Sequence, residues 1–321
     1  MTLYDASSDT SPAAKSALIF GCGYLGIRVA RKLICEGWRV AALTRSADRA
    51  RALAAEGIDP QLGDWNDRRA LSGLHATART ATHVLVSVGY DPRSKKSRHE
   101  VYVEGLRGAL EVISPASRVC YVSSTGVFHQ HDGRWVDECS PCHPASEGGA
   151  AHLRAEELLR RVRPPQSRAA TVVLRMAGLY GPGRVPRLAM IRRGEPIATA
   201  SEGFLNLIHI DDAAECVLRA WAHPAPAPLY LIADGHPVVR AEYYQEMARL
   251  SGSPPVRFTA STASSPTASS PTASSPTASS RGDSNKRIWT HRMQRDLLSR
   301  LAFPSYRHGL RAILGNEARR G

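Results

Sequence analysis

The sequence carries a glycine-rich motif, G-x-G-x-x-G, directly after its first apolar run. Its glycines are Gly21, Gly23 and Gly26. In a turn between a strand and a helix, the first glycine permits the tight turn, the second lets the backbone approach a pyrophosphate, and the third lets the helix pack close to the strand. Free N–H groups and the helix dipole at a helix N-terminus favour phosphates. The motif therefore predicts a dinucleotide cofactor, bound by these glycines and by the intervening Tyr24 and Leu25.

The residues around the motif have the periodicity of a strand, a turn, a helix and a second strand. Residues 17–20 form a short apolar run, and a helical pattern extends from about 27 to 36. A second apolar run, residues 38–43, follows Gly37. A lone G-x-G-x-x-G is weak evidence, but in this context it indicates a Rossmann-type cofactor site.

The end of the second predicted strand, residues 43–46, indicates which dinucleotide is bound. NAD-binding proteins usually place Asp or Glu about 20 residues after the first glycine, where it binds the ribose hydroxyls. Here the first acid is Asp48, and Arg45 stands before it. A guanidinium can bind a 2′-phosphate bidentately, whereas a carboxylate would repel it. Arg45, with Ser46 and Arg49 beside it, therefore favours NADP(H) over NAD(H). The alternative is that Arg45 is a solvated residue in an arginine-rich chain.

The composition is that of a globular chain. Its 321 residues are 43% hydrophobic, which is enough for a large core. No apolar run approaches the roughly 20 residues that span a bilayer, so we expect no membrane contact. Residues 1–16 lack a basic segment followed by an apolar one, so we expect no signal peptide and a cytoplasmic location.

A formal net charge of +13 raises the question of nucleic-acid binding. Lysine occurs only at positions 15, 32, 95, 96 and 286, so nearly all of the positive charge comes from arginine. Together with the abundant alanine, this is typical of a compositional bias. The two local clusters, residues 93–99 and the segment after 281, carry neither a nucleic-acid-binding motif nor interleaved aromatic residues. We therefore expect no nucleic-acid partner.

Residues 139–143, Cys-Ser-Pro-Cys-His, match the C-x-x-C-H of covalent haem sites, and C-x-x-C also serves redox and zinc chemistry. Haem attachment of that kind requires an export signal. Zinc would require a second ligand pair, but the other four cysteines stand singly and far apart. A thioredoxin-like pair belongs at a helix start, whereas this one lies in a Pro-containing segment. We predict a surface loop with incidental cysteines and no metal.

Strand and helix patterns alternate along the chain, which predicts an α/β fold with a Rossmann-type, doubly wound parallel sheet. Further strands are predicted at 83–88, 118–122, 171–175 and 230–232, and further helices at 49–56, 98–113, 152–162, 212–222, 241–250 and 306–314. We expect a flexible N-terminus, a cofactor-binding domain, a small C-terminal substrate lobe interwoven with that domain, and a low-complexity insertion of Thr-Ala-Ser-Ser-Pro repeats. Their residues are 1–16, 17–177, 178–258 with 281–321, and 259–280 respectively.

Three later segments, in a fixed order, make the prediction more specific. Residues 119–128 contain Ser-Ser-Thr-Gly-Val-Phe, residues 174–183 read Leu-Arg-Met-Ala-Gly-Leu-Tyr-Gly-Pro-Gly, and residues 206–214 contain His-Ile-Asp-Asp-Ala-Ala. They resemble the Ser-Ser-x-x-Val-Tyr, Arg-x-x-x-x-Tyr-Gly-Pro-Gly and His-Val-Asp-Asp-Val-Ala segments of extended short-chain dehydrogenases/reductases, the NAD(P)-dependent epimerase/dehydratase family. With Gly63-Asp64 after the third strand, the resemblance extends over residues 17–253. It adds Asp64 and Trp65 to the expected cofactor-binding residues.

The resemblance breaks at the catalytic set. In this family a Ser or Thr acts with a Tyr-x-x-x-Lys pair, often with an Asn on a helix, and the Lys lowers the pKa of the Tyr and binds the ribose. Ser124 matches the serine, but this chain has no Tyr between 121 and 180, no Lys between 96 and 286 and no Asn between 66 and 206. Residues 153–156, laid on the family's pattern, put His152 at the lysine position and Gly148 at the tyrosine position. This loss resembles the atypical branch of the family, as do residues 285–288 and 303–310.

His152 and Tyr180 are the candidates to replace the lost tyrosine. A histidine titrates in the useful pH range, and His152 should lie on a helix face that meets the cofactor. The alternative is a solvated or core histidine in a site that has lost its chemistry. Tyr180 lies on a loop that approaches the substrate in relatives, and it either supplies a phenol from a new direction or is a structural residue. We expect His209 and Asp211 to hold this loop to the sheet.

The resemblance implies hydride transfer, as a reductase or an epimerase, on a sugar-nucleotide-like or other small carbonyl or hydroxyl substrate. Ser124 would orient the substrate oxygen, and His152 or Tyr180 would manage the proton. The alternative is a non-catalytic NADP(H)-binding sensor or partner-binding protein, because the Tyr, Lys and Asn are missing together. Relatives often pair through a helix bundle, so a homodimer is a further expectation.

Overall fold

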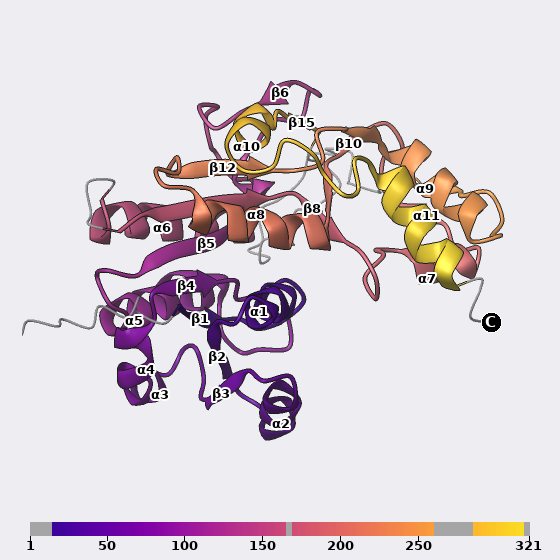
Figure 1. The fold of residues 1–321 in the computed structure, drawn as a ribbon. Coiled ribbons are helices and arrows are strands. Elements are labelled where there is room, and N and C mark those ends of the chain that lie inside the picture. Colours follow the sequence, from indigo (N-terminus) through magenta and orange to yellow (C-terminus); the bar gives the residue numbers. More distant parts are fainter. Residues whose placement is uncertain (1–14, 165–168, 260–284, 318–321) are drawn as a thin grey trace, which may run out of the picture.

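A computed structural model describes residues 15–164, 169–259 and 285–317, and its centre is a seven-stranded sheet. The strand order is β12-β7-β5-β4-β1-β2-β3, and every neighbouring pair is parallel. The strands are β1 (Ser16–Phe20), β2 (Arg39–Thr44), β3 (Asp59–Leu62), β4 (His83–Val86), β5 (Arg118–Ser124), β7 (Thr171–Met176) and β12 (Leu229–Ile232). Helices cover both faces (Figure 1), which confirms the predicted doubly wound α/β fold.

Two hydrophobic clusters lie on opposite faces of this sheet, because successive side chains of a strand point to opposite faces. Ala17 and Ile19 of β1 belong to one cluster, whereas Leu18 and Phe20 belong to the other. The helices that contribute to the first cluster are α1 (Gly26–Cys35), α2 (Ala47–Ala55), α8 (Ile210–Ala222) and α10 (His291–Asp296). Those that contribute to the second are α3 (Arg68–Gly73), α4 (His75–Thr80), α5 (Gly105–Val112) and α6 (Glu147–Val162). Burial on both faces explains why β1 is apolar almost throughout.

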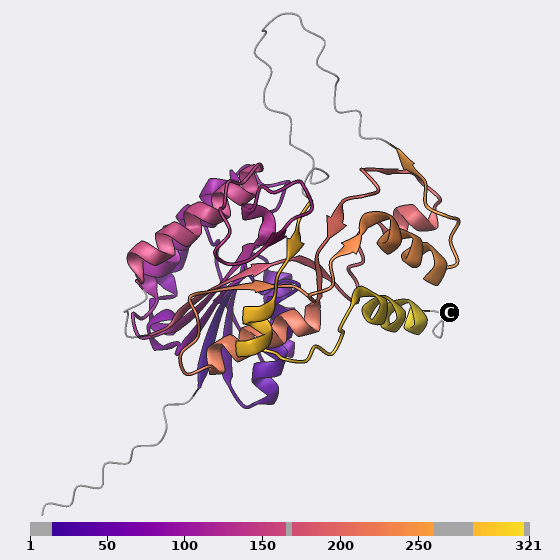
Figure 2. The same ribbon diagram turned by 90° about the horizontal axis from the view of Figure 1, so that it is seen from above.

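A third cluster forms a lobe beside the sheet (Figure 1, Figure 2). Its helices are α7 (Leu188–Arg192), α9 (Arg240–Leu250) and α11 (Tyr306–Glu317). Four two-stranded pairs complete the fold: β6 (Trp135–Val136) with β15 (Arg287–Ile288), β8 (Gly178–Tyr180) with β11 (Leu207–His209), β9 (Ile197–Ala198) with β14 (Phe258–Thr259), and β10 (Phe204–Leu205) with β13 (Val238–Val239). Between α7 and α9 the chain returns to the sheet as α8 and β12, so lobe and sheet are interwoven.

The predicted elements differ from the observed ones mainly at their ends. β1 begins at Ser16, inside the segment predicted to be the N-terminus. The helix predicted from residue 152 begins at Glu147, because Ser146 caps it by accepting the N–H of Gly149. The helix predicted over 98–113 opens with a π-helical turn, Glu100–Glu104. Residues 1–14 and 260–280 of the predicted terminus and insertion lie outside the described residues.

A buried ion pair fixes α6 against the sheet. Arg175 of β7 donates two hydrogen bonds to Glu156 of α6, from Nε to Oε1 at 3.0 Å and from Nη2 to Oε2 at 2.7 Å. Ser123 of β5 donates to Oε1 of the same carboxylate at 2.5 Å. The side chains of Arg175 and Glu156 are only 6% and 5% exposed. Because a buried charge without its partner is costly, this pair holds α6 in one position over β5 and β7.

We predict that Glu156→Ala lowers the free energy of unfolding by about 3 kcal/mol or more, because it leaves the Arg175 guanidinium buried without its counter-charge. Urea denaturation followed by circular dichroism measures the loss. The exposed neighbour on the same helix is the control: Glu157→Ala should change stability by less than about 0.5 kcal/mol. Equal stability of the Glu156 variant and the parent would show that the pair does not hold the helix.

Candidate active site

The three glycines of the motif have three different surroundings. Gly21 has a φ of +89°, and a Cβ there would lie 2.5 Å from the backbone carbonyl of Ser87. A Cβ at Gly26 would lie 2.5 Å from the carbonyl oxygen of Gly21. At Gly23, in contrast, nothing lies within 4 Å of the Cβ position. Gly21 and Gly26 are therefore required by packing, whereas Gly23 borders open space that a pyrophosphate can fill.

The N-terminus of α1 is open to an anion beside this space. Its N-cap residue, Leu25, makes no side-chain cap hydrogen bond, and the first turn holds no acidic residue. Leu25 itself is buried and packs in the core. Two guanidinium groups lie over the Tyr24 ring, with Cζ of Arg28 4.3 Å and Cζ of Arg184 5.4 Å from its centroid. The helix dipole and the nearby positive charge both favour a phosphate here.

A cavity of about 240 Å³ leads from this loop along the ends of β2, β3 and β4. Its lining includes Gly21, Arg45, Asp64 and Trp65 of the predicted cofactor residues, with Arg49, Asp91 and Lys96. Nη2 of Arg45 lies 4.0 Å from the Asp91 carboxylate. Arg49 donates from Nη2 to the carbonyl oxygen of Cys22 at 3.1 Å. The cavity can therefore hold a nucleoside beside the glycine loop, with several cations around it.

The other predicted cofactor residues, Ser46, Trp65 and Asp64, have different roles in the structure. Ser46 accepts the N–H of Arg49 through Oγ at 3.3 Å, so its side chain caps α2. Trp65 is buried, and its Nε1 donates to the carbonyl oxygen of Val101 at 2.7 Å, so it forms a wall of the cavity. Asp64 accepts the N–H of Asn66 at 2.8 Å and keeps lone pairs for a ligand.

Ser124 lies at the C-terminal end of β5, in register with Met176 of β7. Its Oγ accepts the N–H of Gly126 at 3.0 Å, and the side chain is half-buried. A hydroxyl that accepts one hydrogen bond keeps its own proton to donate. Ser124 can therefore donate to a substrate oxygen, as predicted for it.

His152 is a neutral, packed residue in this structure. Its ring stacks on Tyr102 with centroids 4.1 Å apart, and its Nδ1 lies 3.0 Å from Oη of Tyr121. Burial, with the nearby Arg98, lowers the pKa of His152 to about 4. Burial raises the pKa of Tyr121 well above its usual value, so Tyr121 donates, Nδ1 accepts and Nε2 carries the hydrogen. At neutral pH this His152 can donate a hydrogen bond, but it is a poor general acid.

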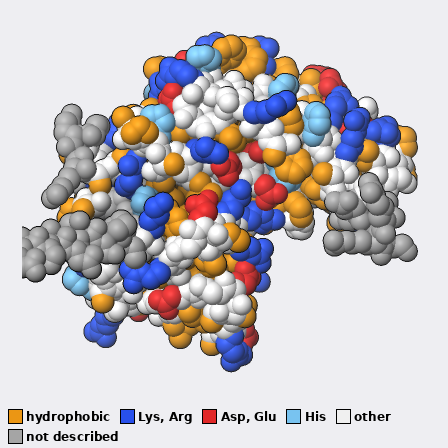
Figure 3. Space-filling view, in the orientation of Figure 1, with side chains coloured by type: hydrophobic (Ala, Val, Ile, Leu, Met, Phe, Trp, Pro, Cys, Tyr) orange, Lys and Arg blue, Asp and Glu red, His pale blue; other side chains and the backbone are white. Residues whose placement is uncertain are grey.

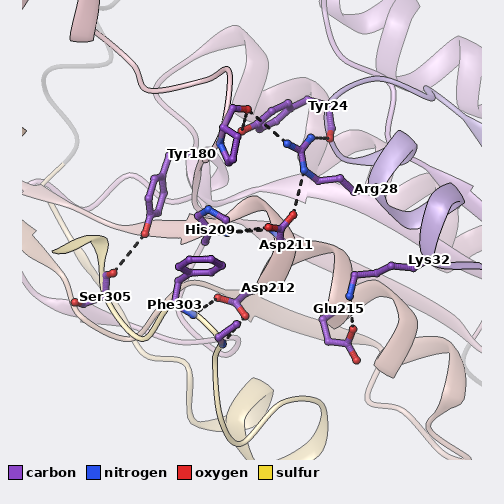
Figure 4. A network of polar contacts seen from close by, with 12 residues as sticks. Tyr24, Arg28, Lys32, Tyr180, His209, Asp211, Asp212, Glu215, Phe303 and Ser305 are labelled. Carbon is purple, nitrogen blue, oxygen red and sulfur yellow. Dashed lines mark hydrogen bonds and ion pairs between the residues drawn. The ribbon is translucent and has the colours of Figure 1, made fainter. Parts of the chain in front are cut away.

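Tyr180 lies away from this group, inside the lobe. It is fully buried, packs edge-on against His209 and donates from Oη to the carbonyl oxygen of Ser305 at 3.5 Å (Figure 4). Burial raises the pKa of Tyr180, which makes it a poor source of a phenolate. The geometry therefore favours the structural alternative over a catalytic role.

His209 and Asp211 lie in the polar network of Figure 4. His209 caps α8 by accepting the N–H of Asp211 through Nδ1 at 3.4 Å, and its ring lies against Phe303 with centroids 3.6 Å apart. The Asp211 carboxylate accepts from Nε of Arg28 at 3.2 Å. These contacts tie the end of β11 to α1 and to the C-terminal segment, which is the structural part expected of them.

Arg98 and Tyr102 join the group around His152 without having been predicted for it. Tyr102 stacks on the imidazole, and its hydroxyl accepts the N–H of Tyr90 at 3.2 Å. Both residues lie at the π-helical turn or just before it, and such turns are frequent at functional sites. Arg98 belongs to the basic segment 93–99, which is visible in the sequence, but the sequence does not show which residues the Arg98 side chain contacts.

The cysteine segment that raised the question of metal or redox chemistry lies between β6 and α6. Cys139 is exposed, Cys142 is half-buried, and both thiols are free. Among the described residues, no three His, Cys, Asp or Glu side chains gather where they could hold a metal ion.

The parallel sheet, the open glycine loop and the cavity beside it define a Rossmann-type dinucleotide-binding protein. Residues 17–233 match the NAD dependent epimerase/dehydratase family. The chain belongs to this family, which confirms the resemblance found from the motifs.

Two curated relatives and one solved structure illustrate the similarity. Protein YeeZ of Escherichia coli K12 is 28% identical over 253 residues, which cover 78% of this chain and 89% of YeeZ. The 4-hydroxy-2-methyl-3-oxo-4-farnesyl-3,4-dihydroquinoline-1-oxide ketoreductase of Stigmatella aurantiaca is 27% identical over 230 residues, covering 68% of this chain and 67% of that protein. The structure of a conserved protein of unknown function from Silicibacter pomeroyi has a TM-score of 0.72 at 27% identity, over 94% of this chain and 99% of that one.

We predict that Gly23→Ala weakens binding of NADPH at least about 10-fold while the melting temperature stays within 2 °C of the parent, because the new methyl meets no protein atom but occupies the open space. Nicotinamide fluorescence measures the binding. Gly73→Ala, where a Cβ also meets nothing within 4 Å, is the matched control and should bind as the parent does. A Gly23 variant with full affinity would place the pyrophosphate elsewhere.

We predict that the imidazole of His152 titrates near pH 4, well below the 6.5 of a free histidine. Because the folded pKa is lowered, unfolding takes up a proton between pH 6.5 and 4, so stability falls as the pH is lowered through that window. NMR titration of the ring, assigned with His152→Asn, gives the pKa directly. The parent should also lose more stability than His152→Asn between pH 7 and 4.5. A midpoint near 6.5 would restore His152 as an acid at neutral pH.

Proposed function

We propose that this protein is an NADP(H)-dependent oxidoreductase or epimerase of the atypical extended short-chain type, acting on a small carbonyl or hydroxyl compound such as a sugar nucleotide. The observation that carries the proposal is the glycine loop, whose Gly23 borders open space at the uncapped end of α1. Gly21, Gly23 and Gly26 would hold the pyrophosphate, and the cavity beside them would hold the adenosine. The nicotinamide, when bound, supplies or accepts a hydride.

The preference for NADP(H) rests on charge at the far end of the cavity. Arg45, Arg49 and Lys96 line it, and the Arg45 side chain is 61% exposed. Within the described part of the chain, the ion-pair partner of Arg45 is Asp91 at 4.0 Å, so its guanidinium can turn to a 2′-phosphate. Asp91 is the counter-argument, since a carboxylate there can also bind ribose hydroxyls.

Ser124 supports chemistry at this site, because its hydroxyl keeps a proton for a substrate oxygen at the edge of the sheet where the strands end. The Stigmatella relative is a ketoreductase by name, which agrees with reduction of a carbonyl. Against catalysis stands the neutral His152 beside a glycine at position 148. This observation favours the second candidate, a non-catalytic NADP(H)-binding sensor, and only turnover of bound NADPH by a carbonyl compound separates the two.

A small-molecule substrate remains the expected partner. On the face shown in Figure 3, Lys and Arg side chains are scattered among acidic, apolar and polar groups, with no continuous basic stripe of the kind that follows a nucleic-acid backbone. Within the described residues, no helix has both the length and the apolarity that crossing a bilayer requires. The cytoplasmic location and the homodimer stay predictions.

We predict that Arg45→Ala weakens NADPH binding about 10- to 100-fold and leaves NADH binding within about 2-fold, because charge-assisted hydrogen bonds to the 2′-phosphate are lost. Titration with each nucleotide, followed by nicotinamide fluorescence, is the measurement. Arg51→Ala removes an exposed arginine of α2 that pairs with Asp48, and it should bind both nucleotides as the parent does. Equal affinity of the parent for NADH and NADPH would contradict the NADP(H) assignment.

A further inference from the structure

We propose that Arg98 binds an oxyanion of the substrate, in the place from which the family's tyrosine is missing, and that the substrate therefore carries a carboxylate or a comparable charged oxygen beside its reacting carbon. The inference rests on the proposed function for the reaction, but the binding site itself follows from the geometry of Arg98.

Arg98 fills the space that a side chain at position 148 would take. A Cβ on Gly148 would lie 3.4 Å from Nη1, 3.6 Å from Cδ and 3.8 Å from Cζ of Arg98. Position 148 is where the motif comparison puts the tyrosine. A larger side chain at position 148 would have to displace the guanidinium, so the observed position of Arg98 requires a small residue there.

The position over Gly148 brings Arg98 to the side of the site that holds Ser124. Gly149, the next residue of α6, packs so closely that a Cβ on it would overlap the carbonyl oxygen of Gly126. Gly126 in turn donates its N–H to Oγ of Ser124 at 3.0 Å. Two consecutive glycines at the start of α6 thus contact Arg98 and the loop that follows Ser124, so both lie at the first turn of this helix. Arg98 also contributes to the lowered pKa of His152, which places its charge near the imidazole.

Arg98 is held in place without using up its donors. Its guanidinium stacks over the Tyr90 ring, with Cζ 4.1 Å from the ring centroid. Its Nε lies 3.6 Å from the Glu147 carboxylate, which is 70% exposed, whereas Arg98 is 27% exposed. Among the residues that the structure describes, no hydrogen bond from Arg98 is found. An oriented guanidinium with free N–H groups suits a carboxylate or another oxyanion.

The chemistry differs from that of the tyrosine it replaces. A phenol exchanges a proton, whereas a guanidinium stays charged and gives none up. Arg98 can therefore bind a charged oxygen and stabilise negative charge near Ser124, but it leaves the proton to water or to another group. The guanidinium recognises charge, and so it selects acidic substrates over neutral carbonyl compounds.

Calorimetric titration of oxalate into the cofactor-free protein, at constant ionic strength, tests the site. We expect millimolar binding by the parent and a loss of about 10-fold or more in Arg98→Met, since two charge-assisted hydrogen bonds disappear. Arg154→Met removes an exposed arginine of the same α6 and is the matched control, expected to bind as the parent does. Equal oxalate affinity of the parent and Arg98→Met, or no binding by the parent, would overturn the proposal.

A second variant, expected to strengthen oxalate binding, separates the role of Arg98 from a general loss of folded protein. Glu147→Gln removes the carboxylate that pairs with Arg98, so oxalate should bind more tightly than to the parent, by about 2-fold or more. NADPH titration of Arg98→Met separates the two proposals. Retained NADPH binding with lost oxalate binding supports both, whereas failure of NADPH to bind the parent defeats the proposed function and leaves the oxalate result to decide on Arg98.

Discussion

The close approach of α1 to β1 is the constraint on which the rest of the structure depends. Gly26 lies so near the carbonyl of Gly21 that no larger residue fits, and Gly21 in turn lies against the backbone after β4. Between β1 and β4 the strand order reverses direction, so the chain leaves these two strands toward opposite sides and a crevice opens at their ends. Because the helix begins directly at that crevice, the positive end of its dipole lies beside the open space at Gly23. The cofactor site is thus a consequence of backbone packing, and few side chains are needed to create it.

The start of α6 shows the same dependence on small residues with a different outcome. The buried pair of Glu156 and Arg175 fixes the middle of this helix on β5 and β7. With that position set, the first turn must meet the loop after β5, and only a glycine at position 149 avoids the carbonyl of Gly126. Gly148 then leaves room for Arg98, which lies two residues before the π-helical turn. A fixed positive charge therefore lies over position 148, and the neighbouring His152 stays neutral.

Much of the fold and of the cofactor loop could be predicted from the sequence, because both depend on local pattern. The alternating strands and helices indicated the parallel sheet, and the close packing expected at Gly21 and Gly26 is found around them. The pyrophosphate expected beside Gly23 stays a prediction. The surroundings of His152 could not be predicted in this way. Tyr121 and Tyr102 belong to other elements, and they contact the ring only when β5, the π-helical turn and α6 are packed together. Burial in this packing, with the nearby Arg98, moves the pKa of His152 below the useful range. The contact of Arg98 with Gly148 could not be predicted for the same reason, because the sequence of a basic segment does not show which residues its side chains contact.

The guanidinium of Arg28 helps to connect the glycine loop with the segment that leads into the lobe. Arg28 of α1 donates to the carbonyl oxygen of Tyr24 at 2.8 Å, to Asp211 at the start of α8 at 3.2 Å and to the carbonyl oxygen of Pro182 at 3.5 Å. Tyr24 also donates to the Pro182 carbonyl, at 3.2 Å. Two residues of the cofactor loop region thus hold the segment that leads into the lobe, and Asp212, next to Asp211, accepts the N–H groups of residues 302 and 303 that lead into α11. The glycine loop and the two chain segments that carry the lobe are therefore joined through hydrogen bonds to α1 and α8.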